Sequence, residues 1–148
     1  MTSVPTPHAI KEMYMKRHFI SLALGAICLT AMAATGKTKV YMYGFAEVIG
    51  DSTVYITEIQ EVDSAYTNSK DKFLYGRSEY SAQLRSYLHQ QGVERPTCVT
   101  SYAVSRKKID KKMAALRKRC NGKMKRYIKT IKTEDFAYKA VVPEVQHP

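Results

Sequence analysis

The stretch TCVTSYAVSRKKIDKKMAALRKRC, residues 97–120, predicts one strand that runs directly into one strongly basic helix. Its first eight residues are mostly β-branched, aromatic or small, a composition typical of strands. Ser105 then stands where a helix N-cap belongs, and Gly122 follows the helix where a left-handed residue often ends one. Within the helix, apolar residues recur at steps of four, three and four, which places them on one narrow stripe: Ile109, Met113, Leu116 and Cys120.

Two strands are predicted upstream of this unit. Residues 39–48 and 53–59 are rich in Tyr, Val, Ile and Phe, and the Ile-Gly-Asp-Ser sequence between them has the chemistry of a turn. Together they predict an antiparallel hairpin. Residues 60–76 show no clear period, so we expect a long connection there, either a functional loop or a short element.

The remaining elements complete an α+β pattern. Ser78 is placed to cap a helix over residues 79–91, and residues 124–132 and 136–142 have strand composition. The main order is therefore β-β-α-β-α-β. It predicts a single small domain with a mixed or mainly antiparallel sheet and both helices on one face of that sheet.

The N-terminal part of the chain has the layout of a secretory leader. A basic start at residues 15–18 is followed by an apolar run and a small-x-small site at residues 31–33, so residues 15–33 predict a signal peptide. Residues 1–14 are then an upstream extension, and residues 34–148 form one domain with a loose C-terminal tail. We expect an exported protein, periplasmic or secreted; the alternative is a retained membrane anchor.

Charge is concentrated in the second half of the domain. The chain carries a formal charge of +11, and residues 105–132 hold thirteen Lys and Arg against one acid, Asp110. Such a segment favours anionic partners, and export disfavours nucleic acid, so we expect an anionic lipid headgroup or an acidic glycan. The alternative is a solvated surface without a partner. The residues expected to contact a polyanion are Lys107, Lys111, Lys118, Lys125 and Arg126.

Motifs for catalysis or metal binding are not found in the sequence. It has no C-x-x-C, no H-x-x-x-H and no Gly-rich phosphate loop. We therefore expect no cofactor, no metal and no catalytic residues, and favour a binding or assembly role over an enzyme. The alternative is an envelope enzyme whose site is built by the 60–76 connection around Asp63, Tyr66 and Arg77.

Two cysteines remain after the predicted cleavage site, Cys98 and Cys120. An even pair in an exported protein is compatible with a disulfide, and the lengths of the strand and the helix would bring both residues to one level. Two buried thiols with mismatched side-chain directions would explain the sequence equally well.

From about Lys39 to Ala140 the chain resembles small exported bacterial proteins without an assigned function. The segments that carry the resemblance are Asp51–Tyr55, Phe73–Arg77 and Tyr80–Arg85. Separately, residues 99–132 are similar to half of a SPOR domain, a strand, an amphipathic helix and a strand. SPOR domains bind peptidoglycan glycan strands on their sheet, so this resemblance implies glycan binding.

Overall fold

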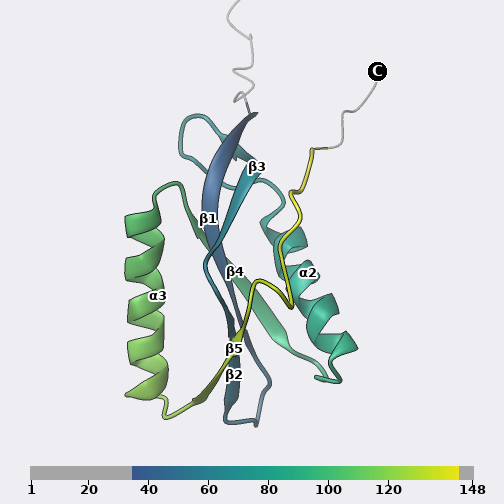
Figure 1. Ribbon diagram of the computed structural model, residues 1–148, viewed down its shortest axis with the longest axis vertical. Helices are drawn as coiled ribbons and strands as arrows, with labels where there is room; N and C mark the ends of the chain where they lie inside the picture. The colour runs from purple at the N-terminus through teal and green to yellow at the C-terminus, as the bar shows by residue number, and fades with distance from the viewer. Residues whose placement is uncertain (1–34, 144–148) are drawn as a thin grey trace, which may run out of the picture. The chain divides into compact units, whose positions relative to one another are not determined.

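The computed structural model describes residues 35–143, and its organising element is a long strand to which three others pair (Figure 1). This strand is β1, and the sheet is mixed, because β5 runs parallel to β2 whereas every strand paired to β1 is antiparallel to it. The elements are β1 (Thr35–Glu47), β2 (Thr53–Thr57), β3 (Gln60–Asn68), α2 (Arg77–Gln90), β4 (Thr97–Ala103), α3 (Arg106–Asn121) and β5 (Tyr127–Ile131). The predicted α+β class is confirmed, and the predicted order lacks only β3.

β3 occupies the segment for which a long connection was expected. β2 and β3 follow one another along β1, and both are antiparallel to it. Phe45 lies opposite Ile56 and Met42 lies opposite Gln60, so one extra residue is inserted between these two pairs. The register shifts again between Thr38 and Val40. Each inserted residue bends and twists a strand and breaks its two-residue period. This is why the sequence pattern did not predict β3.

The two helices cover opposite faces of the sheet, so the prediction that both lie on one face was wrong (Figure 1). Met42 of β1 packs into the cluster under α2, whereas its neighbour Tyr43 packs into the cluster under α3. Successive side chains of a strand point to opposite faces. Because both kinds of position are buried here, the central strand needs a cover on each side.

The ends of the helices differ from the prediction in detail. Gly76, with φ 66°, is the N-cap of α2, while the Ser78 hydroxyl donates to the Glu79 carboxylate instead of capping the helix. Ser105 is the N-cap of α3, as predicted, but its side chain makes no capping hydrogen bond. Gly122 has φ −88° and is not left-handed; an added Cβ would lie 3.0 Å from the Lys118 carbonyl oxygen, so close approach of the backbone favours glycine there.

The chain after β5 was expected to form a last strand, but residues 136–141 form an irregular strap along α2 (Figure 1). Side-chain amides replace the hydrogen bonds of a ladder. Gln60 donates to the Phe136 carbonyl at 2.7 Å and accepts from the Tyr138 N–H at 2.8 Å, and Gln83 makes the same pair of bonds to Lys139 at 2.9 and 2.8 Å.

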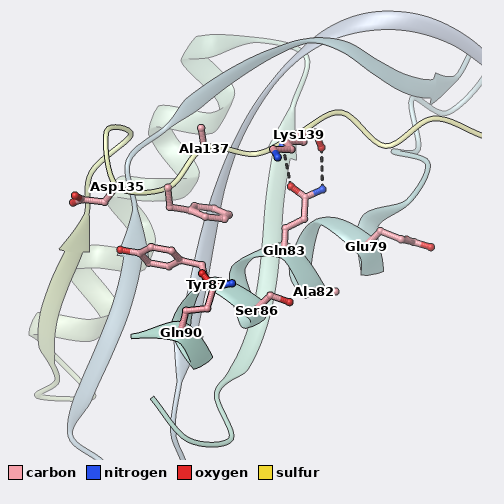
Figure 2. Close-up of a pocket in the computed structure, with 10 residues that line it drawn as sticks. Glu79, Ala82, Gln83, Ser86, Tyr87, Gln90, Asp135, Ala137 and Lys139 are labelled. Carbon is pink, nitrogen blue, oxygen red and sulfur yellow. Dashed lines mark hydrogen bonds between the residues drawn. The ribbon is translucent and has the colours of Figure 1, made fainter. Parts of the chain in front are cut away.

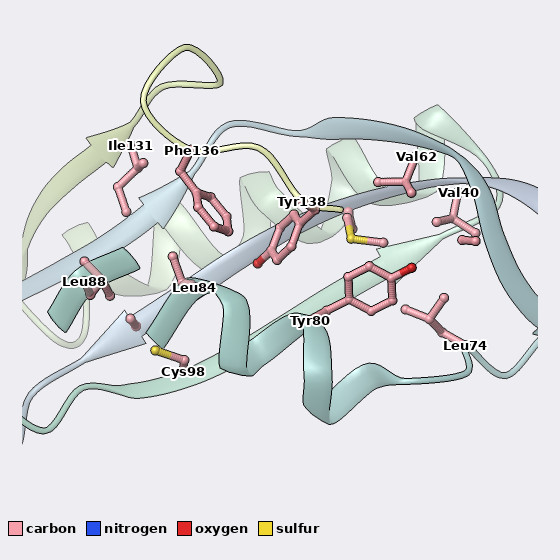
Figure 3. Packing of buried hydrophobic residues seen from close by; sticks show 13 residues of the cluster. Val40, Val62, Leu74, Tyr80, Leu84, Leu88, Cys98, Ile131, Phe136 and Tyr138 are labelled. Carbon is pink, nitrogen blue, oxygen red and sulfur yellow. The ribbon is translucent and has the colours of Figure 1, made fainter. Parts of the chain in front are cut away.

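Aromatic packing anchors this strap in the core. Figure 3 shows Phe136 and Tyr138 beside Leu84 and Tyr80 of α2. The rings of Phe136 and Tyr138 lie 4.9 Å apart, and those of Tyr80 and Tyr138 lie 5.8 Å apart, both edge to face. Such pairs add stability beyond the area they bury. Within residues 35–143, no helix is both long and apolar enough to span a membrane.

Candidate functional site

The outer side of α3 carries a line of lysines that the fold does not use. Lys107, Lys111 and Lys118 are exposed and lie opposite the buried stripe of this helix; we call them the α3 ridge. Within the described residues, none of the three lies within 4.0 Å of a carboxylate oxygen. Their charge is therefore met by solvent or by something outside this part of the chain.

Three other cations of α3 have partners within the described chain, one in α3 itself and two outside it. Arg106 forms an ion pair with Asp110 at 3.0 Å. The Lys112 ammonium donates to the Tyr102 carbonyl at 2.9 Å, and Arg117 donates to the Thr130 hydroxyl at 3.3 Å. These three residues flank the α3 ridge. They have partners within the protein, whereas the three lysines of the ridge point toward solvent.

Lys125 and Arg126, the two candidates beyond α3, have different surroundings. Lys125 is exposed and has φ 46°. The Arg126 guanidinium donates to the Asp51 carbonyl oxygen, and its backbone N–H donates to the Cys120 carbonyl at 2.9 Å. The N–H of Thr53 lowers the pKa of the Asp51 carboxyl, and the charge of Arg126 adds to this effect. Arg126 thus holds the β1–β2 turn against the end of α3.

The three residues predicted for a loop site are not brought together. Asp63 lies on β3 and approaches Lys39 at 3.5 Å, and Tyr66 lies opposite Lys37 on the same face of the sheet. Arg77 begins α2 on the other face, where its Nε donates to the Thr100 carbonyl at 3.1 Å. The premise of a loop was also wrong, because residues 60–68 are a strand.

A broad groove of about 650 Å³ lies between α2 and the strap (Figure 2). One of its polar groups is already occupied, since Figure 2 shows the Gln83 amide bonded to the backbone of Lys139. Ser86 lines the groove, but no hydrogen bond in the described part of the chain joins it to an imidazole or a carboxylate, the contact that would activate a serine.

Of the two alternatives for the cysteines, the disulfide was wrong and the pair of buried thiols is observed: Cys98 and Cys120 are both free and buried. Cys98 packs in the cluster under α2 and Cys120 in the cluster under α3, so the sheet lies between them. Burial raises the pKa of both thiols, which lowers their reactivity. Across residues 35–143, no group of three His, Cys, Asp or Glu is arranged to hold a metal ion.

The structure also gathers a set of cations that the sequence pattern did not single out. Lys72, Arg77, Lys108 and Lys112 line a cavity of about 450 Å³ around Tyr102. Lys72 and Arg77 lie about thirty to forty residues before Lys108 and Lys112 in the chain. The only pattern that could have indicated them is the spacing of Lys108 and Lys112, one helical turn apart on α3.

The chain matches no protein-family model, no curated protein and no solved structure.

Proposed function

We propose that the protein is an exported, non-enzymatic binding domain whose α3 ridge contacts an anionic component of the cell envelope, a lipid headgroup or an acidic glycan. The observation that carries the proposal is the ridge itself. Three exposed lysines stand in line on one helix, with no carboxylate of the described chain beside them. Clustered charge of one sign attracts polyanions by displacing their counterions.

The position of the charges adds support, because it is unfavourable for the helix alone. The first turn of α3 contains no acidic residue and begins with Arg106, Lys107 and Lys108. Cations near a helix N-terminus oppose the helix dipole, by about 0.3–1 kcal/mol each at an exposed site. A local conflict of this kind is expected where a sequence serves a contact outside the fold.

The ridge can be tested on a heparin column with a salt gradient. We expect the wild type to elute at high salt and the variant K107Q/K111Q/K118Q to elute much earlier, since glutamine keeps the helix and removes the charge. The matched control is K37Q/K70Q/K139Q, which removes three exposed lysines outside α3. Elution of the wild type at low salt, or equal shifts of both variants, would show that the ridge is only a solvated surface.

Vesicles distinguish the two ligand classes within the proposal. The Kd for anionic vesicles, from co-sedimentation, is compared with the Kd for a heparin oligosaccharide. A lower Kd for the vesicles indicates a headgroup, and a lower Kd for heparin indicates an acidic glycan. The ridge variant should lose whichever of the two contacts the wild type makes, while circular dichroism shows an intact fold.

Export is the second half of the proposal, and it concerns residues that lie outside the described part of the chain. The basic, apolar and small-residue succession over residues 15–33 supports it. Expressed in a bacterium with this leader, the protein should reach the periplasm or the medium with its first residue near Ala34. An intact leader on cytosolic protein would contradict export.

The SPOR-like resemblance of residues 99–132 corresponds to β4, α3 and β5. A SPOR domain contacts glycan through its sheet, whereas here α2 and α3 cover opposite faces of the sheet. We therefore place the proposed contact on the outer side of α3.

A further inference from the structure

We propose that the cavity around Tyr102 is a binding site for one phosphate monoester group, free or carried by a larger molecule. We call this cavity the Tyr102 pocket; four cations, Asp71 and residues 101–104 line it. The inference rests on the proposed function in one respect: the phosphate is expected to belong to a lipid or a glycan of the cell envelope. The pocket itself is built from residues other than the α3 ridge, so the two can be tested apart.

Three separate elements deliver the cations of the pocket. Lys72 comes from the turn after β3, Arg77 from the start of α2, and Lys108 and Lys112 from α3. The Arg77 guanidinium carbon lies 6.0 Å from the centre of the Tyr102 ring, and the Lys112 nitrogen lies 5.9 Å from the same point. Helices that cover opposite faces of the sheet thus each place one positive charge beside the Tyr102 ring, at the β4 edge of the sheet.

Hydrogen bonds to the backbone of β4 fix these side chains. Arg77 donates through Nε to the Thr100 carbonyl at 3.1 Å, and Lys112 donates to the Tyr102 carbonyl at 2.9 Å. Both bonds satisfy carbonyl groups that an edge strand would otherwise expose. Arg77 has five N–H donors. In the described chain only Nε has a partner, which leaves the terminal nitrogens of the guanidinium for a ligand.

The Tyr102 side chain is held in place by hydrogen bonds of its hydroxyl to the turn after β3. Its hydroxyl accepts from the Leu74 N–H at 3.0 Å and donates to the Lys72 carbonyl at 3.2 Å. Lys72 has φ 56°, a left-handed conformation that is uncommon outside glycine. The turn is therefore tied down at the residue that contributes a cation, so the pocket is organised before any ligand binds.

The charge of the pocket favours a dianion. Its lining has four cations and one carboxylate, Asp71, which accepts from the Phe73 N–H at 3.2 Å. None of the four cations forms an ion pair within the part of the chain that the structure describes. A carboxylate ligand offers one charge and two oxygens, whereas a phosphate monoester offers three oxygens and a charge of roughly −1.5 to −2 at pH 7. Four cations supplied to one cavity by three segments of the chain suit the phosphate.

The probe for this site is glucose 6-phosphate, titrated into the ¹⁵N-labelled protein and followed by amide chemical shifts. We expect saturable shifts at Lys72, Ser101 and Lys108. Lys108→Gln should raise the Kd about fivefold or more, the effect of removing one charge about 4 Å from another in water. The matched control is Lys107→Gln, its neighbour on the ridge, which should leave the Kd within about twofold.

Further arms identify the ligand class and its source. Acetate should bind at least tenfold more weakly than glucose 6-phosphate. Tighter binding to vesicles of phosphatidic acid than to the soluble sugar phosphate would identify a lipid as the source, and the reverse a phosphorylated glycan. Absence of saturable shifts, equal effects of K107Q and K108Q, or acetate binding as tight as phosphate binding would overturn the inference.

The heparin experiment separates this inference from the proposed function. If K107Q/K111Q/K118Q loses heparin but still binds glucose 6-phosphate, both sites stand. If the wild type is not retained on heparin but binds glucose 6-phosphate, the proposal for the ridge fails and the proposal for the Tyr102 pocket stands. If the wild type binds heparin but not glucose 6-phosphate, the pocket proposal fails alone.

Discussion

The two faces of the sheet are closed in different ways. Under α2, polar side chains turn inward: Gln60 holds the strap, and the Thr100 hydroxyl lies 3.1 Å from that of Ser81 and 3.3 Å from that of Tyr138. Under α3, the cluster is closed by a narrow stripe from Ile109 to Cys120, and the rest of that helix is mostly cationic.

The difference separates residues that specify the fold from residues that face a partner. Within the described chain, every buried side-chain nitrogen or oxygen has a hydrogen-bond partner. The polar groups under α2 are thus committed to structure, and removing one leaves another unsatisfied in the interior. The lysines of the α3 ridge have no such commitment. Substitutions of the polar groups under α2 should therefore lower the free energy of unfolding. Substitutions of the α3 ridge should weaken ligand binding and leave the free energy of unfolding nearly unchanged.

The largest effect is expected for Gln60→Ala. Gln60 is buried and bonds both Phe136 and Tyr138, so its loss leaves an N–H and a carbonyl unsatisfied and opens a cavity. We expect the free energy of unfolding to fall by about 2–5 kcal/mol. Urea unfolding followed by tyrosine fluorescence measures it.

The matched control is Gln83→Ala, because the half-buried Gln83 makes a similar pair of bonds that are exposed to solvent. There water can replace the lost amide, and the expected cost is at most about 1 kcal/mol. Equal losses for the two variants would show that burial does not decide the contribution of these amides.

A second effect on the α2 face is a loss of stability at alkaline pH. Burial raises the pKa of Tyr138 to about 12, above the ordinary value of 10.0. The unfolded chain ionises first, so this contribution is complete below pH 10 and is lost as pH rises to 12. It amounts to about 2–3 kcal/mol.

Unfolding measured from pH 9 to 12 tests this contribution. Tyr138→Phe should make the alkaline decline shallower, whereas Tyr127→Phe, at an exposed position, should leave it unchanged. An unchanged decline in Tyr138→Phe would assign it to other groups.

Variants of the α3 ridge should barely alter stability. K107Q/K111Q/K118Q removes like charges without touching the buried stripe, so we expect a change within about 0.5 kcal/mol. At low salt the sign should be stabilising, since repulsion is relieved, and the change should shrink as salt screens it. A loss above 1 kcal/mol in urea unfolding would mean that these lysines belong to the fold.

Reducing agent should have no effect on stability. The sheet separates Cys98 from Cys120, so there is no bridge to break. A disulfide closing this loop of about 22 residues would contribute roughly 2–4 kcal/mol. Unfolding with and without dithiothreitol, together with counting alkylated thiols in denaturant, distinguishes the two. If neither Cys98 nor Cys120 can be alkylated without reductant, two thiols fewer than expected, free cysteines are contradicted.

Local patterns predicted most of the elements. Strand β4, helix α3 and the β1–β2 hairpin follow from composition and from the apolar spacing that begins at Ile109. β3 was missed because one residue is inserted between β2 and β3 and a second residue within β3 breaks its two-residue period. The strap was predicted as a strand because its aromatic residues do alternate, although the amides of Gln60 and Gln83 take the place of a neighbouring strand. The predicted placement of both helices on one face was wrong. That prediction assumed a sheet buried on one face only, whereas the neighbours Met42 and Tyr43 are both buried, one on each face.

The candidate sites divide in the same way. The α3 ridge could be predicted, because three lysines at helical spacing share a face whatever the rest of the chain does. The Tyr102 pocket could not, because Lys72 and Lys108 meet only through the tertiary fold. Asp63 and Arg77 are close in sequence but lie on opposite faces, so proximity along the chain was misleading there.

The most direct test of the account is the salt dependence of binding to a heparin oligosaccharide, measured for the wild type and for K107Q/K111Q/K118Q. If the ridge makes the contact, the slope of log K against log salt should be shallower in the variant by about 2, taking roughly 0.7 for each lysine as for a flexible single strand. Equal slopes for the two proteins would contradict the account, because the lysines of the ridge would then displace no counterions from the ligand.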